Sequence, residues 1–177
     1  MLLKEEPELR EIRRFLEEQR IFTLRQPFPT GYCSASAELV YRILNLPMVA
    51  GKVMTCDPKQ IAYNWTHTCN LGLAQTSLDP DRNDPEGNIE VYVDLTKDQF
   101  SNGKRTYQPV SLEVTTRSTF QRYSPRDEQA FFAIMRGRTE GSRKEYENFQ
   151  RKMDALEQTY KTRKCQSPSP ATSDPFS

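Results

Sequence analysis

Histidine is almost absent from this chain of 177 residues, because His67 is the only one. Any chemistry that needs an imidazole must therefore use this side chain. Cysteine is also scarce, and the four thiols form no CxxC pair: Cys33, Cys56, Cys69 and Cys165. Without close pairs or an export signal, the cysteines do not indicate a disulfide framework.

An excess of charge of one sign is missing as well, since 25 basic and 24 acidic residues leave a formal net charge of +1. This balance gives no electrostatic reason to expect nucleic acid or an anionic membrane as a partner. Charged residues interrupt the longest apolar stretch, and the N-terminal sequence MLLKEE is too charged for a signal peptide. We therefore expect a cytoplasmic protein that binds neither nucleic acid nor membranes.

Hydrophobic residues make up only 36% of the chain, which suits one domain with part of the chain outside it. Hydrophobic periodicity and capping signals predict helices over residues 5–20 and 34–44, strands over 49–56, 66–73 and 89–95, a further short strand over 110–114, and helices that begin at Ser124 and Ser142. The stretch between the last strand and Tyr123 is predicted to be polar and irregular.

This order of elements predicts an α+β fold, in which an antiparallel sheet packs on the helix that begins at Cys33. We divide the chain into an N-terminal helix (1–20), a catalytic core (21–122), C-terminal helices (123–165) and a tail (166–177). The tail consists mainly of serine, proline and threonine, so we expect it to be disordered.

The last predicted helix carries an apolar stripe at alternating spacings of three and four residues, formed by Tyr146, Phe149, Met153, Leu156 and Tyr160. Such a stripe must bury one face. Two alternatives follow from it. The helix packs on its own domain, or it pairs with a partner helix, including that of a second copy of the chain.

The strongest candidate for a catalytic site combines Cys33, His67 and Asp94. Cys33 lies at the start of a predicted helix, where unpaired backbone N–H groups stabilise a thiolate. His67 and Asp94 lie on two predicted strands, and antiparallel pairing can bring the carboxylate within hydrogen-bond reach of the imidazole. Gln26, in the loop before Cys33, is the candidate side-chain donor for an oxyanion, together with the backbone N–H of Cys33.

Several other interpretations remain open. Cys33 and His67 are also consistent with ordinary packing in a hydrophobic core. A Cys₃His zinc site is an alternative, although only two of its ligands are close in sequence: Cys33, Cys56, His67 and Cys69. A calcium-loop spacing occurs at Asp79, Asp81, Asn83 and Glu90, but Asp84 replaces the required glycine, which favours a solvated acidic turn. The sequence Asn64-Trp65-Thr66 fits a glycosylation sequon, which has no role without export.

Three segments resemble the core of the transglutaminase-like and papain-like cysteine enzymes: residues 31–44 (GYCSASAELVYRIL), the pair His67-Thr68, and residues 91–100 (VYVDLTKDQF). The last segment is similar to the D-x-T-x-x-Q-F strand end of bacterial transglutaminase-like proteins. In these enzymes a cysteine begins a helix rich in small residues, and a histidine and an aspartate follow on successive strands of an antiparallel sheet.

The resemblance implies that Cys33 is the nucleophile, His67 the general base and acid, and Asp94 the carboxylate that orients the imidazole. The implied activity is cysteine-dependent hydrolysis or acyl transfer on the amide bonds of a peptide or amide substrate, without a metal or organic cofactor. We favour hydrolysis, of the peptidase, amidase or glutamine deamidase type, because no acceptor site is recognisable. The alternative is a non-catalytic interaction protein on the same fold that binds partners through its C-terminal helix.

Overall fold

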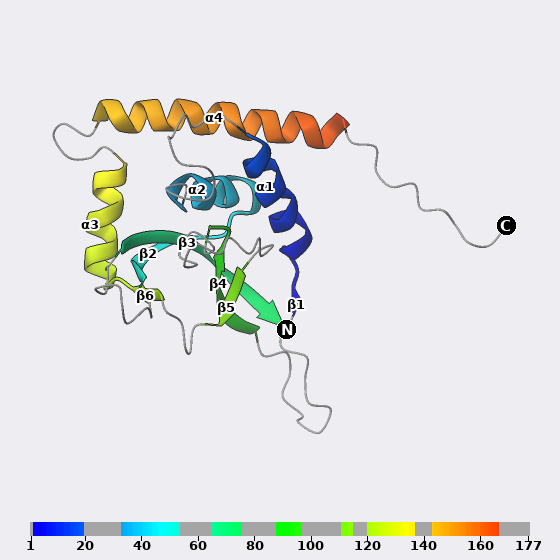
Figure 1. Cartoon of the computed structure of the whole chain (residues 1–177). Coiled ribbons are helices and arrows are strands. Elements are labelled where there is room, and N and C mark those ends of the chain that lie inside the picture. The colour runs from blue at the N-terminus through cyan, green and yellow to red at the C-terminus, as the bar shows by residue number, and fades with distance from the viewer. Residues whose placement is uncertain are drawn as a thin grey trace, which may run out of the picture.

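A computed structural model describes residues 2–19, 33–53, 65–75, 88–96, 111–114, 120–136 and 143–166 of the chain. The fold mixes helices with an antiparallel sheet, so the predicted α+β class is confirmed (Figure 1). The helices are α1 (Glu6–Glu18), α2 (Cys33–Leu44), α3 (Pro125–Met135) and α4 (Arg143–Gln166). The strands are β1 (Leu2–Leu3), β2 (Met48–Val53), β3 (Trp65–Gln75), β4 (Asn88–Asp94), β5 (Ser111–Val114) and β6 (Phe120–Arg122).

The sheet has the order β5-β4-β3-β2-β6, with β1 added beside β3, and every pairing is antiparallel. The long strand β3 is central, because it pairs with both β2 and β4. Strand β6 corrects the sequence interpretation, which treated this stretch as irregular. Three residues carry too weak a periodicity to predict a strand, and only the pairing with β2 fixes this one.

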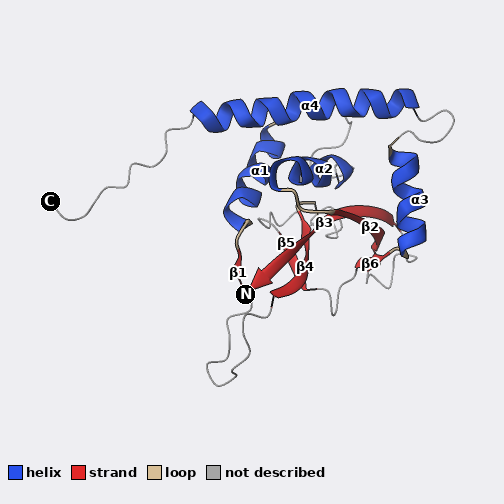
Figure 2. Cartoon of the chain, turned by 180° about the vertical axis from the view of Figure 1, so that it is seen from behind, coloured by secondary structure: helices blue, strands red, loops and turns tan. Residues whose placement is uncertain are grey.

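The helices form layers on one face of the sheet. Helix α2 lies between the sheet and α4, with α1 beside it and α3 at the edge (Figures 1 and 2). Alternation along β4 directs Val91 and Val93 into the core under α2, whereas Tyr92 belongs to a smaller cluster with Phe120. No helix in the described part of the chain is long and apolar enough to span a membrane.

Most residues of the predicted apolar stripe of α4 pack against the chain's own core. Met153, Leu156 and Tyr160 are buried in the same core as four apolar residues of α1. The ring of Tyr160 meets Phe15 edge to face, with 5.1 Å between ring centroids, and its hydroxyl donates to Glu8 Oε1 at 2.7 Å. Both terminal helices therefore belong to the core of the sheet and α2. The tail was predicted to begin at residue 166, but Gln166 is the last residue of α4, and the rest of the tail lies outside the described residues.

A half-buried arginine links α4 to α2. Arg42 forms ion pairs with Glu38 (2.9 Å), Asp154 (2.7 Å) and Glu157 (3.2 Å), and also donates to Gln150. Burial lowers the pKa of this guanidinium, but hydrogen bonds to Asp154 and Glu38 outweigh burial and raise it. Arg42 is thus permanently charged and fully engaged between the two helices.

We expect Leu156→Ala to lower the free energy of unfolding by about 2–5 kcal/mol, because the side chain is fully buried and its removal leaves a cavity. Urea denaturation of the purified protein measures this change. Gln158→Ala, on the exposed side of the same helix, is the matched control and should change stability by less than about 0.5 kcal/mol. Equal small effects would show that α4 is not part of the core.

Candidate active site

The centre of the candidate site is a contact between His67 on β3 and Asp94 at the end of β4. His67 Nε2 lies 2.6 Å from Asp94 Oδ2, and the imidazole is 1% exposed. The antiparallel pairing of β3 and β4, predicted from sequence, brings the two side chains together. Because Nε2 faces the carboxylate, the buried Nδ1 is the ring nitrogen that remains for another partner.

Asp94 is held by the turn that follows it. Its second oxygen, Oδ1, accepts hydrogen bonds from the backbone N–H of Thr96 (2.8 Å) and from the Thr96 hydroxyl (3.1 Å). This is an Asx-type turn, in which a side-chain oxygen caps the backbone two residues on. The buried Arg13 of α1 donates to the carbonyl of Leu95 within the same turn. Both carboxylate oxygens therefore have fixed donors.

Thr96 and Arg13 were not identified by the sequence reasoning. Thr96 does stand in the quoted segment VDLTKDQF, so its spacing of two from Asp94 was a signal for an Asx turn. Arg13 carried no such signal, because an arginine in an amphipathic helix is normally solvated. Its role depends on the docking of α1 near Leu95, which no local pattern encodes.

The third predicted residue, Cys33, is the first residue of α2 and is half-buried. Burial raises the pKa of its thiol, but a hydrogen bond and charge from His67, the backbone N–H of Thr68 and the Ser34 hydroxyl together lower it below its usual value. These groups all favour the thiolate over the thiol. The structure thus brings Cys33, His67 and Asp94 together.

The pKa of the His67 imidazole is shifted in the opposite direction, upward. Burial lowers the pKa of His67, but the charge and hydrogen bond of Asp94, followed by those of Cys33, raise it to about 10. A thiol with a lowered pKa beside an imidazole with a raised pKa favours the charged pair of thiolate and imidazolium near neutral pH.

Polar contacts between α2 and β3 keep Cys33 at this position. The buried Asn70 donates to the carbonyls of Ala37 (3.0 Å) and Leu46 (2.9 Å), and Ser34 Oγ lies 3.3 Å from Thr68 Oγ1. Asn70 therefore satisfies two carbonyls from α2 and the turn after it while it packs the helix on the strand.

An aromatic residue of β6 packs beside the imidazole. The Phe120 and His67 rings meet edge to face with 6.1 Å between centroids, and Phe120 also contacts Tyr92 at 4.9 Å. A Cβ at Gly51 would lie 2.7 Å from the Phe120 ring and 2.4 Å from a backbone oxygen of β6, so only glycine allows this strand to approach.

Several of the remaining candidate residues lie outside the described part of the chain. Gln26, Cys56 and the calcium-like loop up to Asn83 lie outside the described residues, and Glu90 is exposed on β4. Cys69 is buried with Val49 and Phe120. In the described ranges, no three side chains of His, Cys, Asp or Glu are grouped as ligands for a metal ion.

Comparisons of the chain with protein-family models, curated proteins and solved structures found no match.

The raised pKa of His67 predicts a pH-dependent contribution of Asp94 to stability. The imidazolium stabilises the fold fully below the unfolded pKa of about 6.5, and this contribution is lost as the pH rises through about 10. We expect Asp94→Asn to cost about 2 kcal/mol at pH 6, the value of a hydrogen bond to a charged group, and less at pH 10.5.

Urea denaturation at both pH values measures this difference. Asp154→Asn is the control, because it removes an exposed partner of Arg42, which does not titrate in this range. Its effect should not change with pH. An Asp94→Asn effect that is equal at pH 6 and pH 10.5 would contradict a charged His67 in the folded protein.

Proposed function

We propose that the protein is a cysteine-dependent hydrolase or acyl transferase that acts on amide bonds. The observation that carries the proposal is the placement of the Cys33 thiol beside an imidazole that Asp94 holds at 2.6 Å. An activated thiol, a base within reach and a group that orients the base form the general arrangement for nucleophilic catalysis.

The reaction then has two steps. The Cys33 thiolate attacks the carbonyl carbon of an amide and forms a C–S bond, and the His67 imidazolium gives its proton to the departing amine as the C–N bond breaks. Cys33 is left as a thioester. Neutral His67 next takes a proton from water or from an acceptor amine, which attacks the thioester and releases the acid or the new amide with the thiolate.

Asp94 stays ionised throughout and stabilises the imidazolium. His67 alternates between a neutral imidazole and a charged imidazolium in the cycle, and the fixed carboxylate lowers the energy of the imidazolium. The developing oxyanion would accept hydrogen bonds from the backbone N–H of Cys33 and from Gln26.

We extend the proposal to the fold: the helix that begins at Cys33 and the strands β3 and β4 correspond to a transglutaminase-like or papain-like core. The order of the three residues along these elements and their contact support this assignment. We favour release of the acyl group to water, as in a peptidase, amidase or deamidase, over transfer to an amine.

A selective alkylation experiment tests the nucleophile. At pH 6 we expect iodoacetamide to modify Cys33 at least about tenfold faster than Cys165, because a lowered thiol pKa preserves thiolate at this pH. Mass spectrometry of peptides from the folded protein measures the four rates. Cys165 is an internal control because it is exposed on α4, so its slower reaction does not arise from burial. Equal rates at the two residues would contradict an activated nucleophile.

The oxyanion donor is tested separately. We expect Gln26→Ala to lower kcat for p-nitrophenyl acetate by about 10²–10³ with little change in KM, because such a donor acts on charge that develops in the transition state. Release of nitrophenolate measures turnover, and Gln19→Ala at the end of α1 is the matched control. Unchanged turnover would leave the oxyanion to backbone groups.

A further inference from the structure

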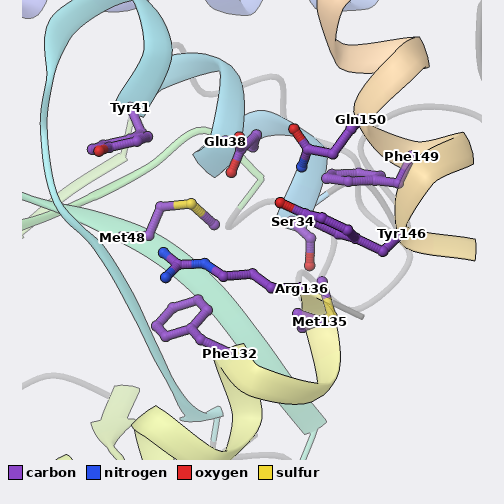
Figure 3. A pocket seen from close by; sticks show the side chains of 10 residues that line it. All are labelled: Ser34, Glu38, Tyr41, Met48, Phe132, Met135, Arg136, Tyr146, Phe149 and Gln150. Carbon is purple, nitrogen blue, oxygen red and sulfur yellow. The ribbon is translucent and has the colours of Figure 1, made fainter. Parts of the chain in front are cut away.

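A cavity of about 360 Å³ lies between α2, the start of β2, α3 and α4 (Figure 3). Its wall includes Ser34, the residue that follows Cys33 in α2. The hydroxyl of Ser34 also hydrogen-bonds to the sulfur of Cys33. The cavity therefore extends to a direct neighbour of the proposed reacting atom.

Six of the other nine lining residues carry large apolar or aromatic side chains, Tyr41 among them, and Glu38, Arg136 and Gln150 add polar groups. Met48 begins β2, Phe132 and Met135 come from α3, and Tyr146 and Phe149 come from α4. Figure 3 shows these side chains arranged around the opening, with Arg136 extended between Met48 and Phe132. A concavity that combines large apolar side chains with several polar groups is typical of a site that receives a ligand group.

Helix α3 carries large apolar residues that are at most partly buried in the described structure. It carries Phe131, Phe132, Ile134 and Met135, yet none of its residues is fully buried. Helix α1, of similar length, buries five. Because an amphipathic helix gains most of its stability from burying its apolar face, a ligand against Phe132 and Met135 would complete this packing.

The charged groups around the cavity differ in their pairing. Glu38 is held by Arg42, and Gln150 accepts from the same guanidinium. Among the described residues Arg136 has no carboxylate partner, and its guanidinium lies over the Phe132 ring at 5.6 Å from the centroid. The cavity thus offers one cation to an incoming anionic group.

A second hollow, of about 490 Å³, continues the first along α3. The two share Tyr41, Met48, Phe132 and Arg136, and the second extends to Glu128 and Gln129. Glu128 is itself engaged by Arg122 at 2.9 Å and by the backbone N–H of Ala50 at 2.8 Å. The combined groove runs from Ser34 past Arg136, which suits an extended chain better than a small compact molecule.

We propose that this groove binds the peptide that Cys33 attacks, with a large apolar side chain of the substrate in the cavity and a nearby acidic side chain paired with Arg136. The inference rests on the proposed function, because it identifies the substrate class for the same nucleophile. A substrate segment with adjacent aromatic and acidic residues fits both the apolar wall and the available guanidinium.

Acetyl-tripeptidyl chloromethyl ketones provide the test. The thiolate forms a C–S bond to the methylene carbon and chloride leaves, so the rate of Cys33 alkylation reports recognition of the peptide. Reagents with Phe at each position in turn are compared with the all-glycine reagent. We expect one Phe position to react about ten to a hundred times faster, as burial of an aromatic side chain predicts. Equal rates for all reagents would overturn the proposal.

Two variants on α3 test the apolar contact. Phe132→Ala should remove most of the preference for the best Phe reagent, whereas Ile134→Ala should retain it, because Ile134 is exposed on the same helix and lines neither hollow. An equal loss in both variants would overturn the assignment of this cavity. Circular dichroism of each variant checks that the total helix content is unchanged.

The proposed pairing of an acidic substrate side chain with Arg136 is tested with peptide reagents that carry Glu or Gln next to the preferred Phe. We expect the Glu reagent to react about five times faster or more, and Arg136→Gln to abolish this ratio. Arg126→Gln, on the exposed first turn of α3, should preserve it. A Glu to Gln ratio near one in the unmodified protein, or a ratio unchanged by Arg136→Gln, would overturn the proposal.

Iodoacetamide separates failure of this inference from failure of the proposed function, because it is too small to need the groove. Selective alkylation of Cys33 by iodoacetamide without any peptide preference overturns the groove alone. Equal alkylation of Cys33 and Cys165 by iodoacetamide overturns the nucleophile and the groove together. A dimer in sedimentation equilibrium that Phe132→Ala dissociates would assign the groove to a second copy and overturn peptide binding.

Discussion

The contact between His67 and Asp94 constrains the rest of this structure. A buried imidazolium is costly unless a carboxylate compensates it, so strands β3 and β4 must keep a register that places the two side chains together. The carboxylate in turn must be aimed, and Thr96 occupies the oxygen that does not face His67. The lowered pKa of Cys33 depends on the same imidazole. One short contact therefore couples the sheet register, the turn after β4 and the properties of the thiol.

The terminal helices contribute to the site as well as to stability. Helix α1 supplies Arg13 to the turn after Asp94, and α4 supplies both core residues and two aromatic walls of the groove. Helix α2 is held between these layers by Asn70 on one side and Arg42 on the other. Residues from both terminal segments therefore lie next to the candidate site and the groove.

The sequence predicted features that repeat locally. The helix at Cys33, the alternation of β4 and the cap at Ser124 were predictable, since each follows from spacing or a short capping pattern, and Ser124 Oγ does accept from the Asp127 N–H at 3.2 Å. Strand β6, Arg13 and the groove were not predictable. Phe120 approaches His67 only because Gly51 permits β6 to pair with β2. The ring contact between Phe120 and His67 joins residues more than fifty positions apart in the sequence.

The two C-terminal helices, α3 and α4, differ in how much of their surface is buried. Helix α4 buries Met153, Leu156 and Tyr160, so its position is fixed by the core. Helix α3 buries no residue fully and is tied to the sheet through Glu128, which accepts from Ala50 and pairs with Arg122. A few polar contacts hold a helix less firmly than a buried apolar face does. The groove wall formed by α3 is therefore less firmly held than Cys33, His67 and Asp94, which lie among contacts between α2, β3 and β4.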